Sequence, residues 1–174
     1  DINVRKRDHG PYYTFYSIHL EDLGFRKFTV GVLWALGVAA EVGIFLIMHR
    51  LMRRFALARV LFVSLLLAVL RWLIIALCGA DLWWLVPAQL LHAASYGSFH
   101  AASIAWVQDT FGEAHAGQGQ ALYSSLGYGA GWALGAGLSG LYWARWGADS
   151  FLVAAATAAV AALVVWRWLL NRRC

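Results

Sequence analysis

Charged residues are scarce in this sequence, at 13% of 174 positions, whereas a soluble domain carries about 25%. Apolar residues make up 61% of the chain, and the mean hydropathy is +0.62. Apolar stretches long enough to cross a bilayer, about 17–25 residues each, recur along the chain. The composition therefore excludes a soluble globular domain and predicts an integral membrane protein that contacts lipid.

Cysteine is almost absent, and so is any basic stripe that would bind nucleic acid. We expect Cys78 and Cys174 on opposite membrane faces, where they form no intramolecular disulfide, and two thiols do not make a metal site. The formal charge of +5 is not arranged along a phosphate-binding surface. We therefore expect no metal, cofactor or nucleic acid. A mixed polar segment precedes the first span, so we expect no cleaved signal peptide.

Five apolar stretches have the length of a membrane span, and a shorter one precedes them. The predicted spans are residues 30–48, 60–78, 83–107, 121–143 and 151–170, with polar loops expected at residues 49–59 and 108–120. Residues 11–20 are aromatic but too short to cross a bilayer, so we expect a truncated or atypical first helix. The chain begins without Met, which indicates a fragment. No sequence repeat is visible, but two helix triplets, as in many transporters, are compatible with this order.

Lys and Arg are concentrated at one end of the predicted helices. The segment of residues 49–59 holds four arginines, and the C-terminal tail adds more. Because positive residues are enriched on the cytoplasmic side, we predict that this face and the C-terminus are cytoplasmic. In the fourth span, Gly127, Gly131 and Gly135 recur every four residues. This spacing favours close helix packing in lipid, and a rocking surface is the functional alternative.

Three ionisable residues lie inside the predicted spans at similar depth. At about 1.5 Å per residue, Glu41 and Arg71 lie roughly 18 Å inside a core about 30 Å thick. On the same scale, His92 lies roughly 13 Å inside. Short loops make their three helices neighbours. An ionisable group at this depth costs about 2.5–3.5 kcal/mol, so such residues usually pair and often mark an ion or substrate path.

The role of these residues has two interpretations. Glu41 and Arg71 form either a fixed neutral ion pair or a proton-coupling device, in which the carboxyl group alternates between a proton and the arginine. His92 is either a satisfied interior histidine or a titrating relay group. The same helix carries a polar stripe that must face inward, because lipid surrounds the chain. The candidates for lining a substrate cavity are Gln89, Ser95, Tyr96, His100 and, from the next span, Tyr128.

Several segments carry a resemblance to a known transporter family. They are GPYYTFYSIHLEDLGF, VGVLWALGVAAEVGIF, LRWLIIAL, AQLLHAASYGSFHAA and GQGQALYSSLGYGAG. Together they resemble the C-terminal half of a phenylpropionate-permease-type transporter of the major facilitator superfamily, which is similar to lactose permease. The resemblance implies an all-α integral membrane fold over residues 1–174: the six-helix C-terminal bundle, helices seven to twelve of twelve. Helices seven and ten would line the central cavity.

The resemblance also implies roles for the buried residues. In lactose permease, helix eight carries a coupling carboxylate, helix nine an arginine, and helix ten a histidine followed three residues later by a second carboxylate. Glu41, Arg71 and His92 match the first three positions, whereas Ser95 stands at the fourth. A direct copy of that mechanism is therefore not expected, and Glu41 must carry more of the coupling.

The sequence thus predicts half of a proton-coupled secondary transporter, not an enzyme, in a bacterial inner membrane. Glu41 is the expected proton carrier, Arg71 its counter-charge and His92 a substrate or relay group. The expected partners are lipid, an N-terminal six-helix half, protons and a small organic solute such as an aromatic acid or a sugar-like compound. The alternatives are a non-transporting fragment or pseudo-transporter, and a haem redox protein. Residues eight apart on one helix, such as His92 and His100, cannot ligate one iron from opposite sides.

Overall fold

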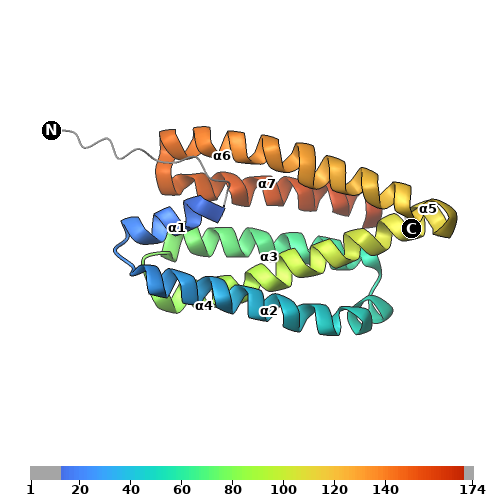
Figure 1. Ribbon diagram of the computed structural model, residues 1–174, viewed down its shortest axis with the longest axis horizontal. Helices are drawn as coiled ribbons and strands as arrows, with labels where there is room; N and C mark the ends of the chain where they lie inside the picture. The colour runs from blue at the N-terminus through green and yellow to red at the C-terminus, as the bar shows by residue number, and fades with distance from the viewer. Residues whose placement is uncertain (1–12, 171–174) are drawn as a thin grey trace.

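Helices make up all the regular structure in the described part of the chain, residues 13–170 of the computed structural model (Figure 1). The α-helices are α1 (Tyr13–Asp22), α2 (Lys27–Arg54), α3 (Leu57–Cys78), α4 (Leu82–His92), α5 (Ser98–Tyr123), α6 (Trp132–Trp146) and α7 (Ser150–Val165). Three π-helical segments, η1 (Ala93–Gly97), η2 (Ser124–Gly131) and η4 (Trp166–Leu170), and one short 3-10 turn, η3 (Gly147–Asp149), join or extend them.

The first predicted stretch is helical from Tyr13, the first described residue, and the first full span is longer than predicted. α1 has 10 residues and ends before Gly24, whose φ of 88° allows the turn into α2. α2 runs from Lys27 to Arg54, beyond the predicted span of 30–48. The six residues HRLMRR contain no glycine or proline and are mostly good helix formers, so the helix continues. The turn into α3 then needs only Phe55 and Ala56, both with extended backbones.

The region predicted as a polar loop, residues 108–120, is helical on both sides of one glycine. α4 begins after Asp81, whose carboxylate accepts a hydrogen bond from the Trp83 amide at 3.0 Å. The helix continues through η1 into α5, and Gly112 interrupts α5 with φ 69° and ψ 170°. Low hydropathy predicted a loop here, but one left-handed glycine is enough to reverse the chain. The chain returns through η2 and α6 and reverses again at Gly147 (Figure 1).

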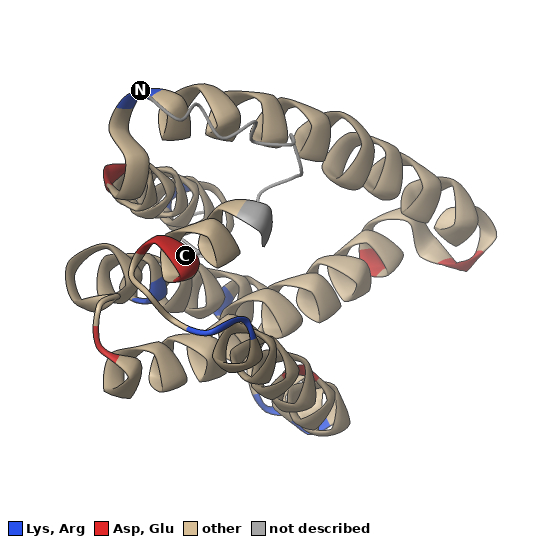
Figure 2. Ribbon diagram, turned by 60° about the vertical axis from the view of Figure 1, so that its left-hand side comes forward, with Lys and Arg blue, Asp and Glu red and all other residues tan. Residues whose placement is uncertain are grey.

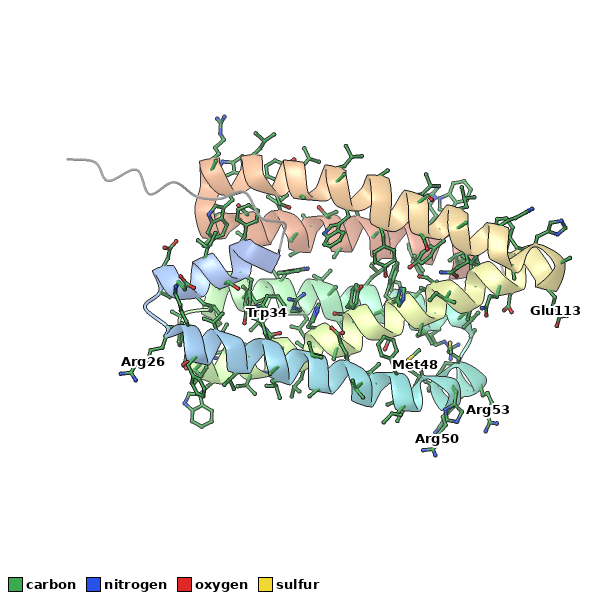
Figure 3. The ribbon with its side chains drawn as sticks, in the orientation of Figure 1. Arg26, Trp34, Met48, Arg50, Arg53 and Glu113 are labelled. Carbon is green, nitrogen blue, oxygen red and sulfur yellow. The ribbon has the colours of Figure 1, made fainter. Side chains whose placement is uncertain are left out.

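Within residues 13–170, three helical stretches are long and apolar enough to cross a membrane: Lys27–Arg54, Leu57–Cys78 and Leu82–Leu169. The third contains the reversals at Gly112 and Gly147. Figure 2 shows long runs of helix without a charged residue. Arg50 and Arg53 lie at the same end of the molecule as Glu113, and Arg26 lies at the opposite end (Figure 3). The charges of these four residues thus lie at the helix ends, as expected of a chain that spans lipid.

Two apolar clusters hold the helices together. The larger one joins α1, α3, α4, α6 and α7 through residues such as Leu20, Ile75, Leu85 and Phe151. Within it, the rings of Trp72 and Phe151 stack at 5.7 Å between centroids. The smaller cluster, at the other end, comprises Met48, Val60, Leu61 and Ala102. Between the two clusters lie the buried polar residues of α3 and α4.

Candidate functional site

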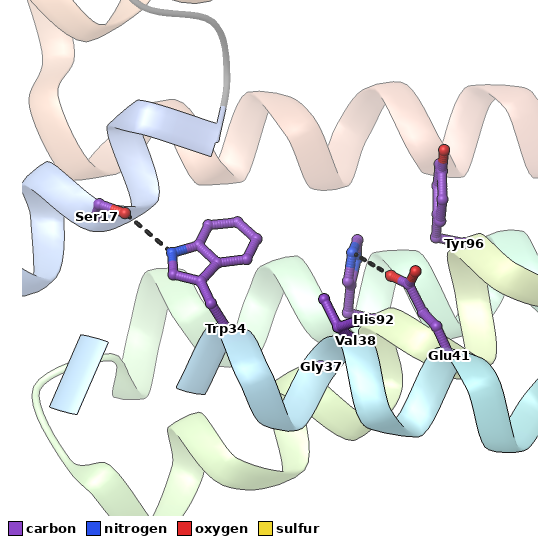
Figure 4. Close-up of a pocket in the computed structure, with 7 residues that line it drawn as sticks. All are labelled: Ser17, Trp34, Gly37, Val38, Glu41, His92 and Tyr96. Carbon is purple, nitrogen blue, oxygen red and sulfur yellow. Dashed lines mark hydrogen bonds and ion pairs between the residues drawn. The ribbon is translucent and has the colours of Figure 1, made fainter. Parts of the chain in front are cut away.

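One face of α2 forms the wall of a cavity of about 640 Å³. We call it the Glu41 cavity; its lining residues are Ser17, Trp34, Gly37, Val38, Glu41, His92 and Tyr96 (Figure 4). Residues three and four apart share a helix face, so α2 presents Trp34, Gly37, Val38 and Glu41 together. α4 and η1 supply the opposite side, and α1 closes one end.

Glu41 and His92 are in direct contact in this cavity. Glu41 Oε1 and His92 Nε2 are 3.0 Å apart, and the side chains are 20% and 8% exposed, respectively. The carboxyl group is therefore reachable from the cavity, whereas the imidazole is almost enclosed by helix. A proton held by this pair can lie on either group, and each placement leaves a hydrogen bond between them.

Arg71 completes the group from the other side of α4. It is buried on α3, and its guanidinium lies 4.1 Å from the centroid of the Trp72 ring. Its positive charge acts on both Glu41 and His92. The three residues predicted for proton coupling therefore lie together, and His92, not Arg71, makes the 3.0 Å contact with the Glu41 carboxylate.

A second cavity of about 750 Å³ lies between α3, α7 and the arm formed by η2 and α6. Most of its lining is apolar and aromatic, including Trp72, Trp132 and Phe151. Arg71, His92 and Tyr96 also line it. His92 and Tyr96 thus face both cavities.

Tyrosines and histidines form a hydrogen-bonded group that joins the arm to α5. We call Tyr96, His100, Tyr123 and Tyr128 the Tyr–His cluster. The Tyr128 hydroxyl lies 2.6 Å from His100 Nδ1 and 3.3 Å from the Tyr96 hydroxyl. The Tyr123 hydroxyl lies 3.5 Å from the same His100 nitrogen. The rings of His92, Tyr96 and His100 stack in sequence, with centroid separations of 5.5 and 6.1 Å.

Two further predicted residues, Gln89 and Ser95, lie on the same helix as His92, and Ser95 also lines the second cavity. Gln89 is 0% exposed, and a Cβ at Gly37 would lie 3.0 Å from its Oε1. Glycine at position 37 therefore lets α2 and α4 approach closely. The Ser95 hydroxyl donates to the His92 carbonyl at 3.2 Å, within its own helix. Among residues 13–170, no group of three or more His, Cys, Asp or Glu side chains could hold a metal ion.

Sequence reasoning missed Trp34 and Ser17. The Trp34 indole Nε1–H donates to the Ser17 hydroxyl at 3.0 Å, and this contact joins α1 to α2 beside the cavity (Figure 4). Trp34 precedes Glu41 by seven residues, which is two helical turns on the same face. That spacing could have identified it, but an aromatic residue in a membrane span does not by itself indicate a site.

Two comparisons place the chain among known proteins. The sequence model of the MFS_1 like family matches residues 4–154. The chain is 35% identical over 121 residues to the Probable 3-phenylpropionic acid transporter of Escherichia coli (strain K12). That alignment covers 70% of this chain and 31% of the relative, so the chain spans about a third of the relative's length. No solved structure matches the chain significantly.

Proposed function

Because this chain belongs to the MFS_1 like family, a family of transporters and not of enzymes, we propose that it is the C-terminal, six-helix half of a proton-coupled symporter. The N-terminal half would complete the transport unit, since midplane sites of such proteins lie between two helix bundles. The observation that carries this proposal is the Glu41–His92 contact at 3.0 Å, at the surface of a cavity inside apolar helices. An ionisable pair among apolar helices is costly, and such pairs usually mark an ion or substrate path.

Glu41 is the proton carrier in this proposal. Its carboxyl group faces the cavity, so it can exchange a proton with whichever side the cavity opens to. When ionised, it is stabilised by the Arg71 charge and by the His92 hydrogen bond; when protonated, it needs no counter-charge. Alternation between these two states moves one proton per cycle.

The substrate is a small organic solute. The E. coli relative is named a probable 3-phenylpropionic acid transporter, which favours an aromatic acid for this chain as well. A sugar-like compound is the second candidate, because the sequence also resembles lactose permease. We place the protein in a bacterial inner membrane, with the Arg50–Arg53 end in the cytoplasm.

Replacing Glu41 with Gln tests the carrier role. Gln mimics the protonated carboxyl group, so the full-length protein reconstituted in vesicles should lose uphill, pH-driven uptake but keep substrate exchange. If Glu41 serves instead as half of a fixed buried pair, its loss costs about 3–5 kcal/mol and the protein inserts poorly. Uptake by Glu41→Gln against a substrate gradient, driven by protons, would refute the assignment.

Orientation has a separate test. Ala56 and Ala80 lie in exposed turns at opposite ends of α3. Single cysteines at these positions should be labelled by an impermeant reagent from opposite sides, with Ala80→Cys labelled from outside. Labelling of both from one side would contradict the proposed topology.

A further inference from the structure

The Trp34 indole is held as a fixed aromatic surface in the Glu41 cavity. Its Nε1–H is bonded to the Ser17 hydroxyl at 3.0 Å. The Tyr16 ring meets it edge-on, at 5.5 Å between centroids and 88° between planes. Two contacts from α1 therefore fix the ring, while Trp34 still lines the cavity. A ring fixed in advance loses little entropy when a planar ligand stacks on it.

Gly37 and Val38 lie between Trp34 and Glu41 on α2 and line the cavity with them. The cavity, at about 640 Å³, is within the range of about 300–1,000 Å³ typical of small-molecule sites. Its aromatic end and its ionisable end are two helical turns apart on α2 (Figure 4). This shape fits a molecule with a ring at one end and a polar group at the other.

The charges around Glu41 decide which polar group can enter. Among residues 13–170, the titratable groups that surround it are His92 from α4, Tyr96 from η1, Arg71 from α3 and, behind Trp34, Tyr16 from α1. With Glu41 ionised, Arg71 positive, and His92 and both tyrosines neutral, the net charge of the group is zero. A substrate carboxylate would leave one uncompensated negative charge among apolar helices, which is costly. One proton added to the Glu41–His92 pair restores neutrality.

From this geometry we propose that the Glu41 cavity binds an aromatic monocarboxylate with its ring on Trp34, and that one proton enters with each carboxylate, so that transport is electroneutral. The inference rests on the proposed symport function and deepens it. A neutral sugar-like solute entering with a proton would leave one uncompensated positive charge instead. The charge balance therefore favours an acid over a sugar.

The decisive measurement is uptake of radiolabelled 3-phenylpropionate by the full-length protein in vesicles, with the pH gradient and the membrane potential set independently. We expect a pH gradient, inside alkaline, to drive accumulation, and a potassium diffusion potential to leave the rate unchanged. Acceleration by an inside-negative potential would overturn the proposal, because it would mean that more than one proton accompanies each carboxylate. Transport of 3-phenylpropionamide as fast as of the acid would also overturn it.

The ring contact is tested with Trp34→Leu and the non-aromatic analogue 3-cyclohexylpropionate. We expect the KM for phenylpropionate to rise about tenfold, with kcat and the KM for the cyclohexyl analogue little changed. Trp83→Leu is the matched control, because Trp83 is 85% exposed at the start of α4, away from the cavity. Trp34→Phe, which keeps a ring, should retain the preference for phenylpropionate and decides the question if Trp34→Leu inserts poorly. An unchanged preference in Trp34→Leu, or a preference lost in Trp34→Phe, would overturn the ring contact.

The two levels of the proposal fail differently. If the wild-type protein moves no solute in response to a pH gradient, the symport function itself is wrong. If it accumulates phenylpropionate but responds to potential, or shows no dependence on Trp34, symport stands and the inference fails. Glu41→Gln adds a third arm: its site should bind the carboxylate without taking up a proton, so exchange should become independent of pH.

Discussion

The two sides of the α4–η1–α5 helix differ sharply. On one side, α2 packs so closely that a Cβ at Gly37 would lie only 3.0 Å from Gln89 Oε1, and Gln89 is fully buried. On the other, the arm of η2 and α6 is mostly exposed, and a Cβ at Gly127 or Gly135 would meet nothing within 4 Å. The predicted close packing of these glycines is therefore not seen within residues 13–170. Small residues show that helices can approach closely, but they do not identify the partner.

The largest difference in stability between the two sides should come from truncating a buried leucine on the packed side. Leu85 of α4 is 0% exposed, whereas Leu141 of α6 is 68% exposed. Leu85→Ala leaves a cavity in the larger apolar cluster and should cost about 2–5 kcal/mol, whereas Leu141→Ala should change stability by less than about 0.5 kcal/mol. Thermal unfolding in detergent, followed by size-exclusion chromatography, measures both. Equal losses would mean that the arm is as tightly packed as α4.

Two glycine substitutions compare the helix contacts directly. At Gly37, a Cβ would lie 3.0 Å from Gln89 Oε1 and 3.9 Å from His92 Cδ2. Gly37→Ala should therefore cost about 1–3 kcal/mol through overpacking against Gln89. Gly135→Ala should be neutral or stabilise the isolated chain by up to about 1 kcal/mol, through helix propensity. If Gly37→Ala lowers the melting temperature less than Gly135→Ala does in the same assay, the inferred difference in packing between the two sides is wrong.

The smallest effect is expected where the two sides are joined by a side-chain hydrogen bond. Tyr128→Phe removes the hydroxyl that lies 2.6 Å from His100 Nδ1 and should cost about 0.5–1.5 kcal/mol. Because the arm is mostly exposed apart from Trp143, the loss should appear as faster amide hydrogen exchange across η2 and α6. Tyr142→Phe on the same arm, where the ring stacks on Trp146, serves as the control. Equal exchange in both variants would show that the Tyr–His cluster does not hold the arm.

Depth along a helix could be read from the sequence, but rotation about the helix axis could not. Counting residues from the membrane boundaries predicted that Glu41, Arg71 and His92 lie at a similar depth, and in the structure the three residues lie close together. The count did not say that Glu41 would touch His92 instead of Arg71, because that depends on how three helices rotate against one another. Trp34 was missed for the same reason, since its role depends on the contact with Ser17 of α1.

The turns were predicted least well, because the hydropathy of a segment indicates whether it contacts water or lipid and not which backbone conformation it adopts. The segments of residues 49–59 and 108–120 are polar, and both were predicted as loops. In the first, the helix continues to Arg54 because nothing in HRLMRR breaks it. In the second, Gly112 alone leaves the helical conformation.

The π-helical segment η1 directly follows His92 and connects the Glu41–His92 pair to the Tyr–His cluster. Such a segment amounts to one extra residue lodged in an α-helix, and each residue advances the helix by about 100°. In η1 the widened turn lets the rings of His92, Tyr96 and His100 stand in one column. If the extra residue moved along the helix, His100 would rotate about the helix axis relative to His92, while the contact between Glu41 and His92 stayed in place. A shift of one residue would thus uncouple the arm from the ionisable pair without breaking either helix.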